Sequence, residues 1–210
     1  MNSQTEYLLQ PGTAGLIEVA IDRPPLGSVQ RGTAVIAHPH PLFGGTMQNK
    51  VVGTLARAFV HSGWTAVRFN FRGVGKSEGT HDHGIGEAQD LLAVIEAQAP
   101  TGPLALAGFS FGGFVTCSAV AQLHGRREPE KIVLVGPATS RFQVPALPTE
   151  LHARALVVHG EQDDTVPLQA TLDWARPQSL PVTVIPGVEH FFHGQLPLLK
   201  GLVVRHLSQA

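Results

Sequence analysis

The stretch LALAGFSFGGFVTCSAVAQLH, residues 104–124, indicates the fold class most clearly. Its first residues form an apolar run of strand length, and the residues from Gly112 onward have the pattern of a helix with little charge. The turn between them, Gly108-Phe109-Ser110-Phe111-Gly112, has a glycine on each side of a serine. Because glycine lacks a Cβ, backbones can approach closely there. The stretch therefore predicts a sharp strand-to-helix turn that holds Ser110 at the end of a sheet.

A serine at such a turn is a candidate nucleophile. The strained turn raises its Oγ above the sheet, and the N–H of Phe111 opens the helix, where unpaired donors favour a developing oxyanion. The hydroxyl needs a base to take its proton. The alternative is a glycine-rich turn with an incidental serine, but the strand–helix context favours catalysis by Ser110.

The acid that should accompany this serine is expected in the loop after the strand at 155–158. Two adjacent carboxylates, Asp163 and Asp164, lie in that loop. Chains with a serine at this kind of turn supply the acid and then the histidine later in the sequence. Either Asp163 or Asp164 could be the acid, and Asp163 could also be a plain turn residue.

The base is expected in the loop after the strand at 181–185. His190 stands there among apolar residues, just past the end of the strand. A histidine in this loop can take the proton of Ser110 and complete a catalytic triad with a carboxylate of the preceding loop. The alternative is that His190 is a packed structural histidine and that His193 is the base.

Short apolar runs alternate with helical patterns along the rest of the chain. Alternation of this kind implies an α/β fold, with a mainly parallel, doubly wound sheet that has helices on both faces. The segment 6–22 has no helical pattern and contains Pro11-Gly12, so we expect the sheet to begin with an antiparallel hairpin. The expected strands besides 104–109 are 33–37, 65–71, 131–135, 155–158 and 181–185. The expected helices are 47–61, 86–99, 112–124, 168–175 and 196–208.

The composition is that of an ordinary folded domain. With 210 residues, 43% of them hydrophobic, the chain can bury a good core, and we expect one domain over residues 1–210. A net charge of -1 gives no reason to expect nucleic acid or an anionic membrane as a partner. No apolar run reaches the length of a membrane span, and the first residues lack the pattern of a signal peptide. The default expectation is a cytoplasmic location.

Four motifs in this order resemble those of the α/β-hydrolase superfamily, and the resemblance covers nearly the whole chain. Besides the serine turn, they are the acid loop HGEQDDTVP (159–167), the histidine loop GVEHFF (187–192) and the loop NFRGVGKS (70–77). More closely, the chain resembles small, cap-less bacterial hydrolases near the dienelactone hydrolases and short-chain esterases. The resemblance puts the acid on Asp163 and the base on His190. Asn70 stands where the family more often has Asp, at a position that is structural there.

The loop HPHPLFGG, residues 38–45, follows the strand at 33–37. The resembling family supplies the second N–H of its oxyanion hole from this loop, beside the N–H of Phe111. The two prolines lack an N–H and cannot serve. Alignment of the family's H-G-x-x-G from His40 puts the donor at Leu42, which we expect; alignment from His38 would put it at His40.

The family often carries a lid after the strand that here is 131–135, and the segment 136–154 is too short for one. We therefore expect an open cleft, with Phe43, Phe142 and Phe191 as substrate-binding walls beside Phe111. Each of these rings could equally be ordinary core. An open cleft suits a small or protruding ester.

Eleven histidines raise the question of a metal site. His38 and His40, and His81 and His83, have a spacing from which two side chains could reach one zinc ion. No cysteine pair and no H-E-x-x-H motif accompanies them, so we expect no metal. The single cysteine, Cys117, lies in the middle of an expected helix and is interpreted as a small buried side chain.

The resemblance implies a serine hydrolase that cleaves a small carboxylic ester or thioester through an acyl-enzyme on Ser110, with no cofactor. A non-catalytic binding protein of the same fold, and a serine peptidase or amidase, are the alternatives. The expected partner is a small-molecule substrate. A homodimer is possible, and the sequence leaves the oligomeric state open.

Overall fold

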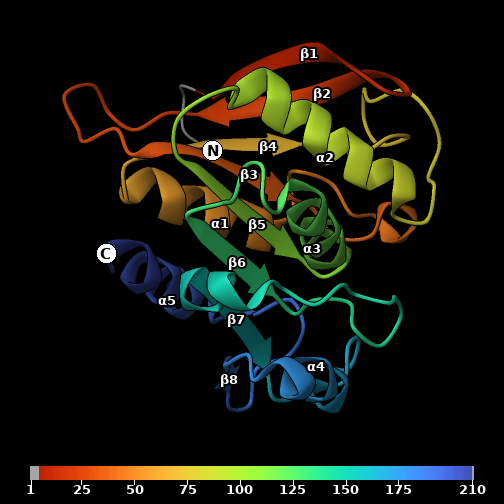
Figure 1. The fold of residues 1–210 in the computed structure, drawn as a ribbon, viewed down its shortest axis with the longest axis vertical. Coiled ribbons are helices and arrows are strands. Elements are labelled where there is room, and N and C mark those ends of the chain that lie inside the picture. Colours follow the sequence, from red (N-terminus) through yellow and green to blue (C-terminus); the bar gives the residue numbers. More distant parts are fainter. Residues whose placement is uncertain (1–4, 210) are drawn as a thin grey trace.

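In the computed structural model, which describes residues 5–209, eight strands form one sheet in the order β1-β2-β4-β3-β5-β6-β7-β8 (Figure 1). β2 pairs antiparallel with β1 and with β4, and the pairs from β4 through β8 are parallel. The expected sheet, mainly parallel with an antiparallel hairpin at its start, is confirmed. The strands are β1 (Glu6–Gly12), β2 (Gly15–Asp22), β3 (Gly32–Ala37), β4 (Trp64–Phe69), β5 (Leu104–Phe109), β6 (Lys131–Val135), β7 (Ala155–Gly160) and β8 (Val182–Ile185).

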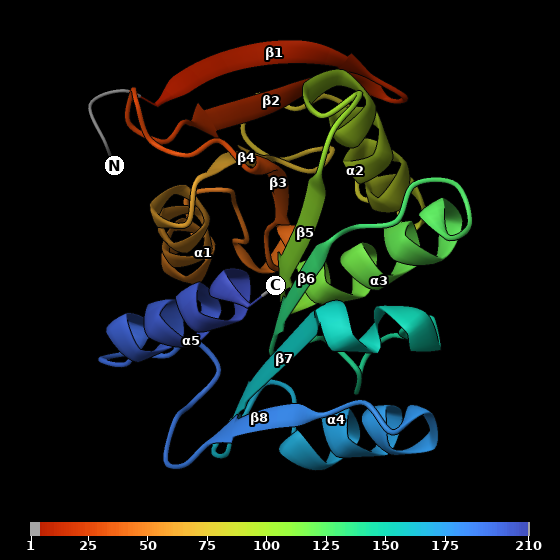
Figure 2. The ribbon, with the colours of Figure 1, turned by 60° about the vertical axis from the view of Figure 1, so that its left-hand side comes forward.

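Helices cover both faces of the sheet. α1 and α5 lie side by side on one face, and α2, α3 and α4 lie on the other (Figure 2). The α-helices of the described residues are α1 (Lys50–His61), α2 (Ile85–Gln98), α3 (Phe111–Leu123), α4 (Leu168–Ala175) and α5 (Leu196–Ser208). Short 3₁₀ helices lie in the connections: η1 (Pro41–Phe43), η2 (Thr149–Arg154) and η3 (Arg176–Gln178). Within residues 5–209, no helix is both long enough and apolar enough to cross a membrane.

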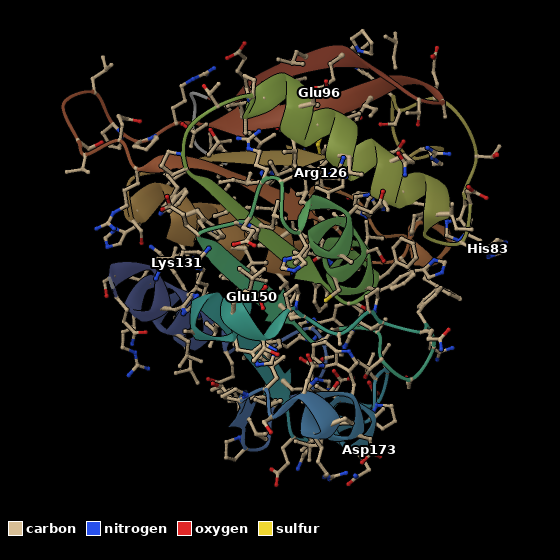
Figure 3. The ribbon with its side chains drawn as sticks, in the orientation of Figure 1. His83, Glu96, Arg126, Lys131, Glu150 and Asp173 are labelled. Atoms are coloured by element: carbon tan, nitrogen blue, oxygen red, sulfur yellow. The ribbon has the colours of Figure 1, made fainter. Side chains whose placement is uncertain are left out.

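Most charged side chains of the described residues lie on the outside of this arrangement, and Arg68, Glu87, Asp90 and Asp163 are buried. Glu96 on α2, Arg126 after α3 and Asp173 on α4 are exposed at the surface (Figure 3). The sheet between the helix layers is apolar, and β5 is buried at every position. Leu106 packs in the layer under α2 and α3, and its neighbour Ala107 packs in the layer under α1 and α5. A strand buried on both faces gives a rigid base for the loops at its carboxyl end.

The hairpin turns at Thr13-Ala14, slightly later than the Pro11-Gly12 pair suggested. Pro11 lies inside β1 and pairs with Leu16. Proline has no N–H for a strand ladder, but β1 is an edge strand and needs partners on one side only. The proline therefore marks the edge of the sheet and not the turn.

α1 begins at Lys50 and not at Met47, where the apolar pattern began. The side chain of Asn49 accepts a hydrogen bond from the N–H of Val51 at 2.8 Å and so caps the first turn. Met47 is buried in the preceding loop. A buried loop residue and a buried helix residue give the same apolar signal, so the pattern placed the start too early. The other expected elements are present, with ends shifted by a residue or two.

Asn70, which replaces the more usual Asp, ties the loop after β4 to two neighbouring segments. Its Oδ1 accepts the N–H of Met47 at 2.9 Å, and its Nδ2 donates to Glu18 on β2 at 2.8 Å. An aspartate here would set a second carboxylate against Glu18. The amide can both accept and donate, so it fits this position.

Candidate active site

The serine turn joins β5 to α3. Ser110 has φ 56° and ψ −116°, a backbone conformation that residues other than glycine rarely adopt. A Cβ on Gly108 would lie 2.2 Å from the carbonyl oxygen of Gly112, and a Cβ on Gly112 would lie 2.3 Å from that of Ala37. The N–H of Ser110 donates to the carbonyl of Val135 on β6 at 2.9 Å. Close backbone contacts therefore explain both glycines and hold the strained serine in place.

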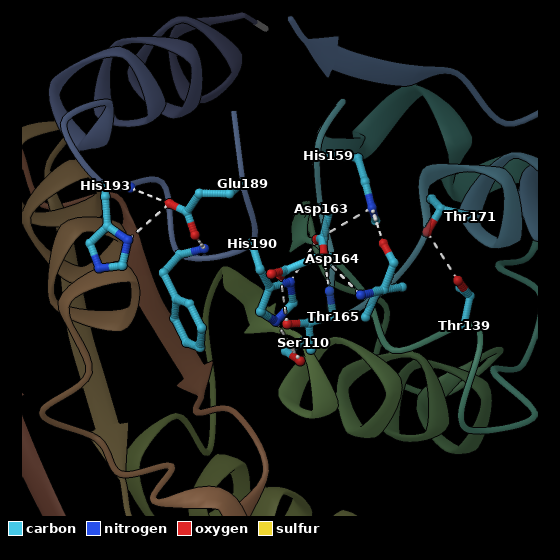
Figure 4. A network of polar contacts seen from close by, with 12 residues as sticks. Ser110, Thr139, His159, Asp163, Asp164, Thr165, Thr171, Glu189, His190 and His193 are labelled. Atoms are coloured by element: carbon cyan, nitrogen blue, oxygen red, sulfur yellow. Dashed lines mark hydrogen bonds and ion pairs between the residues drawn. The ribbon is translucent and has the colours of Figure 1, made fainter. Parts of the chain in front are cut away.

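Ser110, His190 and Asp163 come together although their loops follow three different strands (Figure 4). The Nε2 atom of His190 lies 3.0 Å from the Oγ of Ser110, and its Nδ1 atom lies 2.6 Å from the Oδ2 of Asp163. All three residues are buried, so water competes little for these hydrogen bonds. The arrangement allows the imidazole to take a proton from the serine while the carboxylate stabilises the resulting charge.

The two neighbouring carboxylates of the acid loop differ in their surroundings. The Oδ1 of Asp163 accepts the N–H groups of Val166 at 2.7 Å and Thr165 at 3.0 Å, which leaves Oδ2 for His190. Asp164 is exposed and contacts only the hydroxyl of Thr165, at 3.2 Å. Of the two, the structure brings Asp163 to His190.

The two neighbouring histidines of the last loop also separate. His190 is 1% exposed and lies against the ring of Phe109. The His193 side chain is 71% exposed, and its Nδ1 lies 3.1 Å from Glu189, on the far side of His190 from Asp163 (Figure 4). The alternative base therefore points away from the serine.

His159, at the end of β7, also contacts Asp163, and no sequence motif predicted this contact. It is fully buried, and its Nε2 donates to the carbonyl of Val166 at 2.8 Å. The same nitrogen lies 3.4 Å from the Oδ2 of Asp163. Burial lowers the pKa of His159, so the ring is neutral at neutral pH. A buried histidine gives no distinct sequence signal, because only the fold places it beside the acid.

Two segments offer candidate N–H donors for an oxyanion at Ser110: the start of α3 and the loop after β3. Phe111 begins α3, so its N–H has no partner within that helix. In the loop after β3, the N–H of Leu42 already donates to Nδ1 of His40 at 3.2 Å, and the Leu42 side chain is exposed. His40 lines the cleft beside Ser110, and within residues 5–209 no hydrogen bond engages its backbone N–H. The N–H of Leu42 is therefore already engaged, whereas the N–H of His40 is not.

A cleft of about 390 Å³ opens above Ser110. The three expected aromatic walls all line it: Phe43 is 80% exposed, Phe191 is 41% exposed, and Phe142 stacks on Phe114 with ring centroids 4.7 Å apart. The full lining is Pro39, His40, Phe43, Gly44, Gly45, Asn49, Ser110, Phe111, Ala138, Arg141, Phe142, Thr165, Val166, His190 and Phe191. Among these residues Arg141 is the one Lys or Arg, and there is no Asp or Glu. The cleft is therefore aromatic and without negative charge.

The histidines considered as metal ligands are His38, His40, His81 and His83. Both nitrogens of His38 are engaged, by the carbonyl of Pro39 at 2.6 Å and the N–H of Phe71 at 3.0 Å, and burial lowers its pKa to about 3. The rings of His40 and His81 lie 4.8 Å apart. Within residues 5–209, three side chains of the kinds that can ligate a metal lie near one another elsewhere, at His124, Glu128 and Glu150. Cys117 is buried, which raises the pKa of its thiol to about 12 and makes it a poor nucleophile.

Residues 31–148 match the family model described as serine aminopeptidase, S33. This is more than half of the chain. The chain belongs to this family, within the α/β-hydrolase superfamily. The matched residues include Ser110 and end before Asp163 and His190. The match shows the hydrolase family, and it does not identify a particular substrate.

Relatives of this α/β-hydrolase extend the likeness to the whole chain. A protein of Xanthomonas campestris, XC6422, described as an α/β serine hydrolase without lid, is 39% identical with a TM-score of 0.87, covering 99% of this chain and 95% of that one. An α/β serine hydrolase homologue from Coxiella burnetii is 40% identical with a TM-score of 0.85, covering 97% of each chain. The uncharacterized protein RP471 of Rickettsia prowazekii (strain Madrid E) is 30% identical over 173 residues, 76% of this chain and 71% of that protein.

Proposed function

We propose that this α/β-hydrolase cleaves a small carboxylic ester or thioester through an acyl-enzyme on Ser110. The observation that carries the proposal is the unbroken set of hydrogen bonds from the Oγ of Ser110 through His190 to Asp163, at the floor of an open cleft. Serine, base and acid are then nucleophile, proton carrier and orienting group. Chemistry of this kind requires no metal and no cofactor.

Each half of the proposed reaction moves one proton through His190. First, the Oγ of Ser110 bonds to the substrate carbonyl carbon while its proton passes to Nε2 of His190. As the bond to the leaving oxygen or sulfur breaks, His190 gives that proton to the leaving group. Water then bonds to the acyl carbon, its proton goes to His190 and on to the Oγ of Ser110, and the acid is released.

The negative charge that develops on the carbonyl oxygen needs donors that are already in place. We propose the N–H of Phe111, at the start of α3, as one of them, because the helix terminus favours negative charge. We propose the N–H of His40 as the second, since the N–H of Leu42 is engaged by the His40 ring. The prolines on both sides of His40 restrict that loop and so pre-organise the donor.

The cleft suits an ester better than a peptide with a free amino terminus. A protein that removes amino-terminal residues has to hold an ammonium group, which calls for a carboxylate near the serine. The lining holds no Asp or Glu, and Arg141 would repel the ammonium. Phe43, Phe142 and Phe191 offer apolar walls for an acyl group. The family's description keeps an amidase as the second candidate, and a panel of p-nitrophenyl esters against aminoacyl p-nitroanilides separates the two.

The test of the nucleophile is covalent labelling. A fluorophosphonate probe should label the wild-type protein on Ser110, and Ser110→Ala should abolish both labelling and ester hydrolysis. Circular dichroism of the variant should match that of the wild type, because the alanine removes one oxygen atom only. Labelling of a folded Ser110→Ala protein at the wild-type rate would refute the assignment.

A small-molecule substrate is the expected partner. A single domain over residues 1–210, a cytoplasmic location and a possible homodimer stay predictions of the sequence.

A further inference from the structure

A second and larger cavity, of about 1170 Å³, is lined by residues along α1 and by Leu196 and Lys200 of α5. These two helices cover the same face of the sheet (Figure 2). We call this cavity the α1 groove. Apolar side chains such as Val29, Val60 and Leu196 form part of its wall.

Positive charge gathers in the α1 groove. Five of the fifteen Lys and Arg residues of the chain line it, against one of the sixteen Asp and Glu residues. That acid, Asp22, is bound by Arg68 at 2.8 Å and so offsets none of the other cations. Within residues 5–209, the remaining four make no ion pair: Arg31, Lys50, Arg57 and Lys200.

The net charge of the whole chain is -1, so the positive charge is local to the groove. Like charges on one groove repel one another over distances of about 10 Å in ordinary salt. Lys50 begins α1 and Arg31 lies by Gly63 at its other end, so the cations are spread along the groove. A ligand with several anionic groups removes the repulsion and gains the attraction of more than one cation. The groove is therefore suited to a ligand with several negative charges, such as a phosphate ester or phosphoanhydride.

The α1 groove adjoins the cleft above Ser110. Asn49 lines both cavities, and Gln48 and Lys50 on either side of it line the groove. One substrate could thus reach from the serine, past Asn49, into the groove. The groove is also the larger of the two, about 1170 Å³ against about 390 Å³ for the cleft, so the larger part of such a substrate would lie there.

We propose that the natural substrate is a thioester or ester whose leaving group carries a phosphorylated nucleotide, and that the α1 groove binds this leaving group. The inference rests on the proposed function and names its substrate class. The acyl group occupies the aromatic cleft, and the bond that breaks lies at Ser110. The leaving thiol or alcohol takes the proton from His190. Arg31, Lys50, Arg57 and Lys200 hold the phosphates, and the apolar side chains of the groove pack against the nucleotide.

The experiment compares two thioesters with the same acyl group, butyryl-coenzyme A and butyryl-N-acetylcysteamine. Only the first has a phosphorylated nucleotide in its leaving group. At low ionic strength, kcat/KM for the coenzyme A thioester should be about ten-fold higher or more, and the excess should shrink as salt is added. The neutral thioester should show no such salt dependence.

The charge variant is Arg57→Gln/Lys200→Gln, and Arg126→Gln is the matched control. The double variant should lower the ratio of the two kcat/KM values by about ten-fold, through KM for the coenzyme A thioester. Arg126 is an exposed cation outside the groove, so Arg126→Gln should leave the ratio unchanged. ADP should bind Ser110→Ala in calorimetry and should bind the same protein with the two groove substitutions much more weakly.

The two thioesters also separate this inference from the proposed function. If both are hydrolysed with equal kcat/KM, or if the double variant leaves the ratio unchanged, the inference is overturned and the serine hydrolase stands. ADP that binds without competing against the coenzyme A thioester would also overturn it, because the groove would then not hold the leaving group. If neither thioester nor any p-nitrophenyl ester is cleaved, and the probe does not label Ser110, the proposed function itself fails.

Discussion

His159 and Asp163 lie against each other behind His190: the Nε2 atom of His159 is 3.4 Å from the Oδ2 of Asp163, the same oxygen that faces His190. His159 also donates a hydrogen bond to the carbonyl of Val166 at 2.8 Å. The N–H of Val166 in turn donates to the Oδ1 of Asp163 at 2.7 Å. The neutral ring thus supports both the carboxylate and the loop that carries it. We interpret His159 as a positioning residue for the proposed acid.

His159→Phe should lower kcat by about ten-fold and leave KM nearly unchanged. Phenylalanine fills the space of the ring but has no N–H for Val166, so the acid loop loses one of its fixed points. His159→Gln keeps a donor and should restore part of kcat. Steady-state kinetics with a p-nitrophenyl ester measure both constants. A folded His159→Phe protein with wild-type kcat would show that the contact does not position Asp163.

Asp163→Asn should lower kcat by about 10²-fold or more, because His190 loses its charged partner and the control of its tautomer. Asp164→Asn is the matched control, since Asp164 is exposed and does not contact His190. It should change kcat by less than about two-fold. Kinetics in which the two variants exchange these effects would move the acid to Asp164.

His40→Pro tests the second oxyanion donor directly, because proline removes the N–H. The φ of His40 is −55°, which proline adopts without strain. We expect kcat to fall by about 10²-fold, while His40→Ala, which keeps the N–H, should fall far less. Both variants lose the ring that accepts the N–H of Leu42, so their difference reports the N–H alone. Equal kcat values in the two variants would return the assignment to Leu42.

Gly136→Ala should impair activity more than stability. A Cβ on Gly136 would lie 3.3 Å from the His190 ring and 3.4 Å from the Oδ2 of Asp163. The φ of Gly136 is +47°. Gly102→Ala is the control: its φ is +78° and nothing lies within 4 Å of the added atom. Both variants should lose about 1–2 kcal/mol of unfolding free energy from the left-handed backbone. A large loss of kcat is expected from Gly136→Ala alone, and comparable kcat in both would contradict it.

The free energy of unfolding should decrease as the pH falls below about 6.5. Burial lowers the pKa of His38 to about 3 from the ordinary value of 6.5. Between these values the unfolded chain binds the proton and the folded chain does not, so acid favours unfolding, whereas above pH 6.5 the full stability is present. Burial shifts the pKa of His159 and His206 in the same direction.

Urea unfolding at about pH 7.5 and about pH 5 measures this loss of stability. His38→Gln should show a smaller loss over the same range than the wild type, because it removes the most strongly shifted group. If the two proteins lose stability in parallel, His38 does not titrate as its burial requires.

The fold and the serine turn could be predicted from local patterns in the chain. Both depend on local physics: apolar runs of strand length, helical periodicity, and glycines where a Cβ would meet a backbone carbonyl. These act over a few residues, so the sheet, the hairpin and the position of Ser110 between β5 and α3 could be predicted. The pattern was less exact at boundaries, as at Met47, where burial in a loop looks like burial in a helix.

Resemblance to family motifs pointed to Asp163 and His190, but no local pattern separates Asp163 from its neighbour Asp164. Which carboxylate reaches His190 depends on how β7 and β8 pair, because the two loops follow these strands. The same holds for the N–H groups of the loop after β3, for the contact of His159 with Asp163, and for the groove that meets the cleft at Asn49. A hydrogen bond is made or lost over a few tenths of an ångström. Contacts between distant segments are set at that precision by packing of the whole sheet and its helices, which no short stretch of sequence contains.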